Sequence, residues 1–240
     1  MSGVHRAAAV GFARSADAYE RGRPEYPDAA VSYVVAALPA GAVVLDLAAG
    51  TGKLTRPLLA AGLEVIAVEP VAEMRATLPA GARALEGTAE AIPLQDAAVD
   101  AVTVGQAFHW FDGPSALAEI ERVLRPGGGL ALVWNRRPVE SSELHAAISA
   151  IMAPYRGDAP AHASGAWRDA FAGRELTEWT FAFAQTLDGD GLADRVGSTS
   201  FIAALEEGER SGVLERVRAL AGEGAVAVPY VCEIHLWRPR

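Results

Sequence analysis

Residues 43–54, with the sequence VVLDLAAGTGKL, constrain the fold of this chain more than any other segment. An apolar run leads to Asp46, and a loop of small residues with Gly50 and Gly52 follows it. Glycines let a backbone turn tightly and approach a ligand closely, and the first N–H groups of a helix attract polar ligand groups. A buried strand, a glycine turn and a helix N-terminus together predict a site for a nucleotide-like ligand.

The rest of the chain alternates between apolar runs typical of strands and segments typical of helices. Strands are predicted at residues 43–47, 64–68, 83–86, 99–104, 130–134, 178–187 and 225–237. Helices are predicted at residues 28–38 (with Asp28 as the N-cap), 53–61, 72–78, 114–124, 141–152 and 211–221. Because strands and helices alternate from residue 43 to 134, we expect parallel strand pairing with right-handed crossovers there.

Length and composition fit one folded domain. Of the 240 residues, 51% are hydrophobic and 21% are charged, so a full core can form. We predict a single domain over residues 1–240. In it, residues 1–40 form an N-terminal lid and helix, 41–135 the cofactor-binding core, and 136–240 a substrate-covering segment and the last strands. The excursion over the substrate is expected at residues 135–175.

Charge and cysteine usage narrow the classes of partner. The formal net charge of −9 argues against a nucleic-acid partner, which would need a basic patch. Cys232 is the only cysteine, so no internal disulfide can form, and its apolar neighbours predict a buried thiol in a strand. No segment approaches the ~18 apolar residues of a membrane span, so we expect a cytoplasmic protein.

Two well-known nucleotide loops fit the glycine turn poorly. A phosphate-binding P-loop needs Ser or Thr after Gly-Lys and a glycine five positions earlier, where this chain has Leu54 and Leu47. A dinucleotide loop needs a third glycine, where the chain has Thr55. Glu69 lies 19 residues after Gly50, close to the spacing of a dinucleotide fold. A nicotinamide cofactor is therefore disfavoured but stays open.

S-adenosylmethionine fits this loop better because it has no pyrophosphate and so does not need the third glycine. Asp46 could hold its amino-acid part, directly or through water, and Glu69 could accept hydrogen bonds from both ribose hydroxyls. The structural alternatives are that Asp46 caps the loop backbone and that Glu69 is an exposed strand end.

Four motifs in order resemble the class I S-adenosylmethionine-dependent methyltransferases. They are Leu45-Asp46-Leu47-Ala48-Ala49-Gly50-Thr51-Gly52, Val68-Glu69-Pro70, Gly87-Thr88-Ala89-Glu90-Ala91-Ile92-Pro93-Leu94 and Leu124-Arg125-Pro126-Gly127-Gly128-Gly129. The resemblance implies an α/β Rossmann-like three-layer sandwich, whose mostly parallel seven-stranded sheet has an antiparallel final strand. It also implies cofactor contacts from Asp46, Ala48, Gly50, Gly52, Glu69, Pro70, Met74, Ala89, Glu90, Gln106 and Ala107.

Residues 19–27, 106–111 and 198–200 resemble one subgroup of the type 11 methyltransferases, the trans-aconitate methyltransferase-like proteins. This likeness implies that Tyr19, Arg23 and Tyr26 belong to a lid, with Arg23 or Tyr26 meeting the cofactor carboxylate or an acidic substrate. The alternative is an exposed arm with ordinary surface arginines. Arg136 and Arg137 could also face an anionic acceptor, although solvated surface is an equal reading of that pair.

Methyl transfer of this kind needs few catalytic groups from the protein. Methyl transfer from a sulfonium is an in-line displacement with a neutral leaving group, so alignment and exclusion of water matter most. His109 is the candidate base, needed only for a protonated acceptor, and Trp110 is a candidate wall of the site. The alternative is that His109 orients Trp110 or bonds a neighbouring carbonyl. No second carboxylate follows Asp112 at metal-ligand spacing, so no metal is expected.

The sequence therefore predicts an S-adenosylmethionine-dependent methyltransferase that acts on a small molecule through oxygen, nitrogen or carbon. Two alternatives stay open, a nicotinamide-dependent oxidoreductase and a protein that binds the cofactor without turnover. The sequence does not identify the acceptor or the oligomeric state.

Overall fold

The computed structural model describes residues 20–138, 142–157 and 164–239. Its one seven-stranded sheet has the strand order β3-β2-β1-β4-β5-β7-β6. The strands are β1 (Val43–Leu47), β2 (Glu64–Val68), β3 (Arg83–Leu85), β4 (Val99–Gly105), β5 (Leu124–Arg136), β6 (Thr177–Leu187) and β7 (Val226–Trp237). The first five strands pair in parallel, and β7 is antiparallel to both β5 and β6. The predicted fold class is confirmed.

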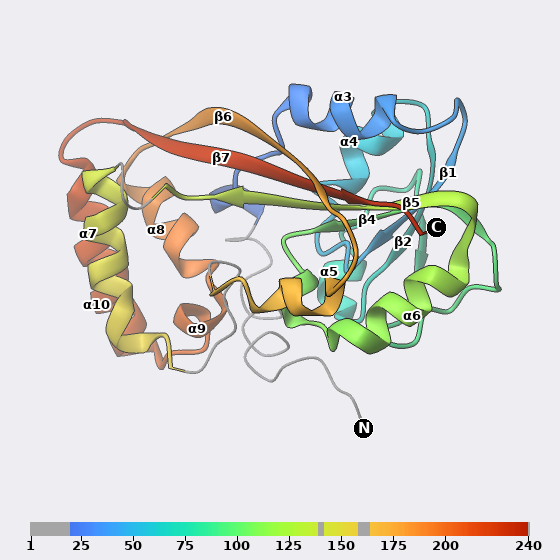
Figure 1. Cartoon of the computed structure of the whole chain (residues 1–240). Helices are drawn as coiled ribbons and strands as arrows, with labels where there is room; N and C mark the ends of the chain where they lie inside the picture. Colours follow the sequence, from blue (N-terminus) through green and yellow to red (C-terminus); the bar gives the residue numbers. More distant parts are fainter. Residues whose placement is uncertain (1–19, 139–141, 158–163, 240) are drawn as a thin grey trace.

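Helices cover both faces of the sheet, which gives the three layers of the sandwich (Figure 1). The α-helices are α3 (Asp28–Ala36), α4 (Thr55–Ala60), α5 (Ala72–Arg75), α6 (Gly113–Val123), α7 (Glu143–Met152), α8 (Gly189–Gly197), α9 (Ser200–Ala203) and α10 (Glu207–Arg218). Short 3₁₀ turns are η1 (Phe108–Trp110), η3 (Ala153–Tyr155), η5 (Ala166–Phe171) and η6 (Ala219–Ala221).

Each face of the sheet has its own hydrophobic core. On one face, buried residues of α3 and α4, such as Val31 and Leu58, pack on β1, β2 and β4. On the other face, Leu117 and Ile120 of α6 and Phe171 of η5 pack on the same strands. Alternate residues of each strand point to opposite faces, so two cores require apolar side chains at nearly every position. This explains why β1 and β2 are continuous apolar runs.

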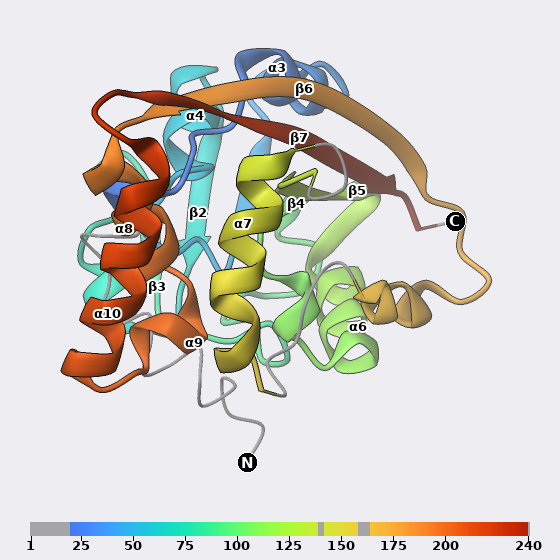
Figure 2. The same cartoon turned by 90° about the vertical axis from the view of Figure 1, so that its left-hand side faces the viewer.

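A lobe of helices lies on the extended ends of β5, β6 and β7, away from the parallel strands (Figures 1 and 2). Its core joins residues of α7, α8 and α10 to the start of β7, including Ile148, Leu192, Val217 and Tyr230. The three long strands thus belong to both parts of the molecule. They bring the lobe beside the carboxyl ends of β1 and β4, where the glycine turn begins.

Several predicted boundaries differ from the structure. Pro27, not Asp28, is the N-cap of α3, because the proline already has the extended backbone of that position. Helix α4 begins two residues later than predicted, since the glycine turn continues through Leu54. Strand β5 begins at Leu124 rather than 130: Leu124 pairs with Val99, and the register then jumps to the pairing of Gly129 with Ala101. The predicted turn at residues 126–129 is therefore a bulge within β5.

Helix α8 was not predicted. Its sequence, GDGLADRVG, contains three glycines, which disfavour a helix. The helix forms because Asp188 accepts a hydrogen bond from the Gly191 N–H as N-cap, and because Leu192 and Val196 are buried in the lobe. The predicted helix at 211–221 likewise begins earlier, at Glu207.

Residues 20–27 connect the lobe to the glycine turn. Arg21 forms an ion pair with Asp194 of α8 at 2.6 Å, and the Gly22 backbone lies directly against that helix. The neighbouring residue, Glu20, faces the opposite way and accepts hydrogen bonds from Thr51 and Arg56. The segment is therefore held on both sides of the opening between the core and the lobe.

Two further expectations concern the surroundings of the chain. Cys232 is fully buried in β7, as predicted, and burial raises the pKa of its thiol to about 12. Among the described residues, no helix combines the length and apolar character that crossing a membrane requires.

Replacing Gly22 by alanine should release the segment 20–27 from α8. The added Cβ would lie 2.4 Å from the backbone nitrogen of Arg195, so one of the two backbones must move. We expect a loss of roughly 1–3 kcal/mol in unfolding free energy and faster trypsin cleavage after Arg21. Gly208→Ala is the control, since nothing lies within 4 Å of its added Cβ. Equal cleavage rates in both variants would contradict the docking of this segment.

Candidate functional site

The glycine turn after β1 has the backbone geometry of a ligand-binding loop. Gly50 and Gly52 have φ angles of 59° and 85°, in the left-handed region that favours glycine. A Cβ at Gly52 would also lie 2.8 Å from Pro79. Three non-glycine residues of the described chain share positive φ angles, and two of them, Ala48 and Gln106, lie at the predicted cofactor site. Backbone strain of this kind concentrates at functional sites.

Glu69 closes the turn from the end of β2. One carboxylate oxygen accepts the Gly50 N–H at 2.9 Å, and the other accepts the Val71 N–H at 2.9 Å. The side chain is buried, not an exposed strand end, so that structural alternative is wrong. Burial raises the pKa of Glu69, and the two backbone hydrogen bonds oppose that rise. The carboxylate thus fixes the glycine turn beside the second strand.

Asp46 lies deeper, with its carboxylate inside the sheet. Its two oxygens accept hydrogen bonds from Thr55 of α4 at 2.6 Å and from Thr103 of β4 at 3.2 Å. The residue is only 1% exposed, and burial raises its pKa from 3.8 to about 6. Asp46 therefore joins β1 to β4 and to the first residue of α4. Its predicted contact with the amino-acid part of a cofactor stays a prediction.

The residues predicted to border an adenine surround the end of β2. Met74 of α5 is buried, and its sulfur lies 3.9 Å from a Cβ built on Gly50. Pro70 is half-buried beside it, and Ala89 is buried in the core under α6. Glu90 accepts a hydrogen bond from the Asp112 N–H at 3.0 Å. The structure thus brings Met74 to the glycine turn and directs Glu90 to the start of α6.

The ends of β4 and β5 form the next part of the site. The backbone N–H of Gln106 donates to Val133, and its side-chain amide lies 3.4 Å from the Asn135 carbonyl oxygen. Ala107 follows, half-buried against the core that contains Phe108. Gln106 and Asn135 therefore stand side by side at the carboxyl edge of the sheet, where α/β proteins bind ligands.

His109 lies in η1, directly after these residues. Its ring packs against Trp110, with ring centroids 5.1 Å apart. His109 also lines a cavity of about 300 Å³ between η1, the start of α6 and η5. The cavity walls include Phe108, Trp167 and Asp169, and this is within the size range of small-molecule sites. Trp110 is not among the residues that line this cavity, and its role as a wall of the site stays a prediction.

The N-terminal segment contributes two of the three predicted lid residues, and Tyr19 lies outside the described residues. Arg23 donates hydrogen bonds to the side chain and carbonyl of Ser198, at 3.0 and 3.2 Å. Tyr26 is buried, with its hydroxyl over Gly105 at the end of β4. The structure thus joins the motif at residues 19–27 to the motif at 198–200, which the sequence left unconnected.

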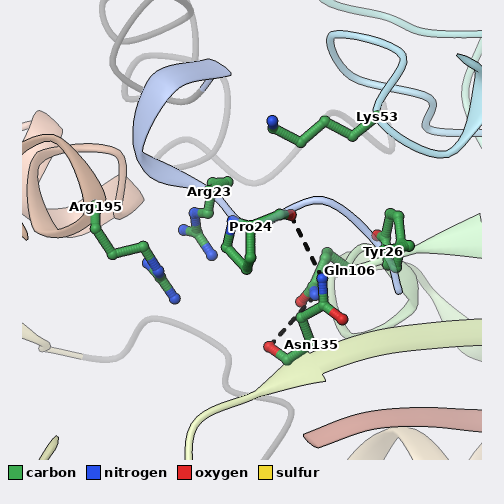
Figure 3. Close-up of a pocket in the computed structure, with 7 residues that line it drawn as sticks. All are labelled: Arg23, Pro24, Tyr26, Lys53, Gln106, Asn135 and Arg195. Atoms are coloured by element: carbon green, nitrogen blue, oxygen red, sulfur yellow. Dashed lines mark hydrogen bonds between the residues drawn. The ribbon is translucent and has the colours of Figure 1, made fainter. Parts of the chain in front are cut away.

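Sequence reasoning missed three polar residues beside this segment, namely Lys53, Asn135 and Arg195. Figure 3 shows them with Arg23, Pro24, Tyr26 and Gln106 around a small hollow of about 20 Å³. Asn135 donates to the Glu25 carbonyl at 3.2 Å, and Lys53 pairs with the Glu25 side chain at 2.7 Å. Lys53 could have been suspected from its place in the glycine turn. Arg195 could not, because α8 itself was not predicted.

Among the described residues, no group of three or more histidine, cysteine, aspartate or glutamate side chains is arranged to hold a metal ion.

Known proteins with similar sequences are methyltransferases. A family model described as a methyltransferase domain matches residues 45–132. An uncharacterized methyltransferase of Mycobacterium tuberculosis is 42% identical over 96% of this chain and 96% of its own length. An uncharacterized methyltransferase-like protein of Schizosaccharomyces pombe is 38% identical over 89% of this chain and 85% of its own. A solved structure of a candidate type II methyltransferase from Anaeromyxobacter dehalogenans has a TM-score of 0.68 at 24% identity. It covers 90% of this chain and 97% of its own, so the fold is shared.

Replacing Asp46 by asparagine should change how folding depends on pH. The folded protein holds the Asp46 proton more tightly than an unfolded chain, because its pKa rises from 3.8 to about 6. Stability from this group is therefore present below about pH 4 and is lost as the pH rises through about 6, by roughly 3 kcal/mol. Urea denaturation should show this loss in the wild type and not in Asp46→Asn. A difference between the two proteins that is constant with pH would contradict it.

Proposed function

The chain belongs to the methyltransferase-domain family of class I S-adenosylmethionine-dependent enzymes, and we propose that it methylates a small-molecule acceptor. The observation that carries the proposal is the buried carboxylate of Glu69 at the end of β2, bound to the glycine turn. The narrower likeness to trans-aconitate methyltransferase-like proteins stays a prediction.

The residues around the turn fit S-adenosylmethionine. Each oxygen of Glu69 accepts one backbone N–H, and each keeps a lone pair for one ribose hydroxyl. Gly50 and Gly52 have positive φ angles that favour glycine, and because glycine has no Cβ atom, a ligand can approach the backbone of the turn closely. Met74 would pack beside the adenine, and Pro70, Ala89 and Glu90 would border it.

The methionine part of the cofactor would lie toward β4 and β5. Ala48, Gln106 and Ala107 would contact it, with Asp46 acting through the turn or through water. Two of these, Ala48 and Gln106, have the strained backbone that a fixed binding geometry explains.

When bound, S-adenosylmethionine would supply an electrophilic methyl group for in-line displacement by an acceptor oxygen, nitrogen or carbon. The chain's own residues position the acceptor and exclude water. His109 is the proposed base for an acceptor that arrives protonated, and it lines the 300 Å³ cavity together with Asp169. Trp110 supports the histidine ring from the side.

The N-terminal segment acts as a lid in this proposal. Arg23 and Tyr26 lie over the ends of β4 and α8, and Tyr19 precedes them in the chain. Residues 1–40, 41–135 and 136–240 then work as lid, cofactor core and substrate cover of one domain. The continuous strands β5 and β7, shared by the core and the lobe, support a single domain. A cytoplasmic location remains part of the proposal.

Two rival functions can be separated by calorimetry and by methyl transfer. A nicotinamide-dependent oxidoreductase would bind NADH and not S-adenosylhomocysteine. A protein without turnover would bind S-adenosylhomocysteine but transfer no labelled methyl group to any compound in a lysate of its own host. Tight binding of the homocysteine product with labelled methyl transfer supports the proposed enzyme.

Replacing Glu69 by glutamine should weaken S-adenosylhomocysteine binding. In glutamine an NH₂ group replaces one carboxylate oxygen, so it faces the N–H of either Gly50 or Val71 without accepting from it. One ribose hydroxyl also loses the oxygen that would accept its hydrogen bond. We expect a loss of roughly 1–3 kcal/mol, or about 5- to 150-fold in affinity, measured by calorimetry. Glu86→Gln is the control, because Glu86 is exposed and pairs only with Arg75 among the described residues. Unchanged affinity in Glu69→Gln would remove the assigned role.

Replacing His109 by alanine should separate turnover from cofactor binding. If His109 is the base, turnover falls by roughly 10²–10⁴-fold while S-adenosylhomocysteine affinity stays within a factor of about two. Turnover is measured by transfer of a labelled methyl group once an acceptor is found. An equal loss of turnover and affinity would instead show that His109 orients its neighbours.

A further inference from the structure

Three arginines from separate parts of the chain converge where the lobe meets the sheet. Arg23 comes from the N-terminal segment, Arg137 from the residue after β5, and Arg195 from α8. Figure 3 shows Arg23 and Arg195 directed toward each other beside Asn135. Arg137 lies close enough to both for their charges to lower its pKa. We call Arg23, Arg137 and Arg195 the basic cluster.

Arg195 is buried without a counter-ion among the described residues. It is 5% exposed, and its Nε donates a hydrogen bond to the Tyr230 hydroxyl at 2.8 Å. Its guanidinium also lies over the Tyr230 ring, 5.8 Å from the centroid. No carboxylate of the described chain lies within 4.0 Å of it, whereas other described arginines, such as Arg21 and Arg56, each have one.

Arg137 also has no counter-ion among the described residues. Its described side-chain contact is with the Met152 sulfur, 3.8 Å from Nη1, and no described carboxylate lies within 4.0 Å. The preceding residue, Arg136, instead pairs with Glu233 at 2.5 Å. Two adjacent arginines that the sequence cannot tell apart therefore have opposite surroundings.

The electrostatics of neighbouring groups agree with this geometry. Burial, together with the charge of Arg195, lowers the pKa of Arg137 to about 9. Burial and the charges of Arg137 and Arg195 lower the pKa of His145 to about 4, so this neighbour is neutral near pH 7. A buried charge without a partner is costly, and several close together are more so. The chain has 30 carboxylate and 21 Lys or Arg side chains, so counter-ions are ample, yet none of the described carboxylates lies within 4.0 Å of Arg137 or Arg195.

We propose that Arg137 and Arg195 bind an anionic group, a carboxylate or a phosphate, of the methyl acceptor, an assignment that rests on the proposed function. Two guanidiniums that meet no described carboxylate match the oxygens of such a group, and Tyr230 fixes the direction of Arg195. Arg195 lines the same hollow as Gln106 and Asn135, at the ends of β4 and β5. The anion is thereby held beside the methionine side of the predicted cofactor site.

The first test measures folding stability without anions, using Arg137→Met and Arg195→Met. If the two arginines stabilise only the fold, both variants melt at lower temperature than the wild type. If they are kept for a ligand, removing a half-buried charge that no described carboxylate neutralises leaves the melting temperature of Arg137→Met unchanged or raises it. The control Arg218→Met removes an exposed arginine paired with Asp190 and makes the same change in net charge.

The second test measures anion binding to protein saturated with S-adenosylhomocysteine. The carboxylate of this product fills the place of the cofactor carboxylate, so the added anion cannot bind there. Inorganic phosphate and citrate are the probes, at ionic strength matched with chloride. We expect one of them to raise the melting temperature of the wild type and of Arg218→Met. The response of Arg137→Met and Arg195→Met should be at least tenfold weaker in apparent affinity. Which probe acts separates a phosphorylated acceptor from a carboxylate.

The outcomes separate this inference from the proposed function. Wild type that binds S-adenosylhomocysteine but responds to neither anion overturns the anionic acceptor alone. Equal responses in all four proteins overturn it as well, since the anion then binds elsewhere. Wild type that fails to bind S-adenosylhomocysteine overturns the proposed function and the inference that rests on it.

Discussion

The buried carboxylate of Asp46 is the interaction on which the site depends. It joins β1 to Thr55 of α4, nine residues farther along the chain, and to Thr103 of β4, 57 residues farther along. Asp46 thereby fixes the two elements that flank the glycine turn, while the turn itself is bound by Glu69 at Gly50 and by Glu20 at Thr51. Burying a carboxylate disfavours its charged form, and two hydroxyl donors offset only part of that effect. The protein therefore gives up stability at neutral pH to fix the turn.

The strands were predictable and much of the lobe was not. Strands β1 and β2 were predicted residue for residue, because a strand buried on both faces is a continuous apolar run. The glycine turn and Glu69 could be found because backbone geometry and spacing restrict the residue types there. Helix α8 escaped notice because tertiary burial, not local propensity, forms it. Arg195 could not be predicted as a site residue because it lies in this helix. The difference between Arg136 and Arg137 could not be predicted either, because it depends on which of the two side chains contacts Glu233.

The two halves of the site follow different physical rules. Around the glycine turn, each buried carboxylate has donors within hydrogen-bond distance, so that half is complete without a ligand. In the basic cluster, the described contacts of the Arg137 and Arg195 guanidiniums are with a sulfur and a phenol, and no described carboxylate lies within 4.0 Å of them. Hydrogen-bonded carboxylates at the glycine turn and arginines without a described counter-ion in the basic cluster are what we expect if the cofactor is the same in related enzymes and the methyl acceptor differs.

Residues 20–27 touch both halves at once. Glu20 holds the glycine turn, whereas Arg21 and Arg23 hold α8, and only a few residues separate these contacts. Because so few residues separate these contacts, the segment cannot move away from the glycine turn and keep its contacts with α8, or the reverse. A movement of residues 20–27 would therefore expose the glycine turn and the basic cluster together, so the proposed cofactor and the proposed anionic group would enter through the same opening.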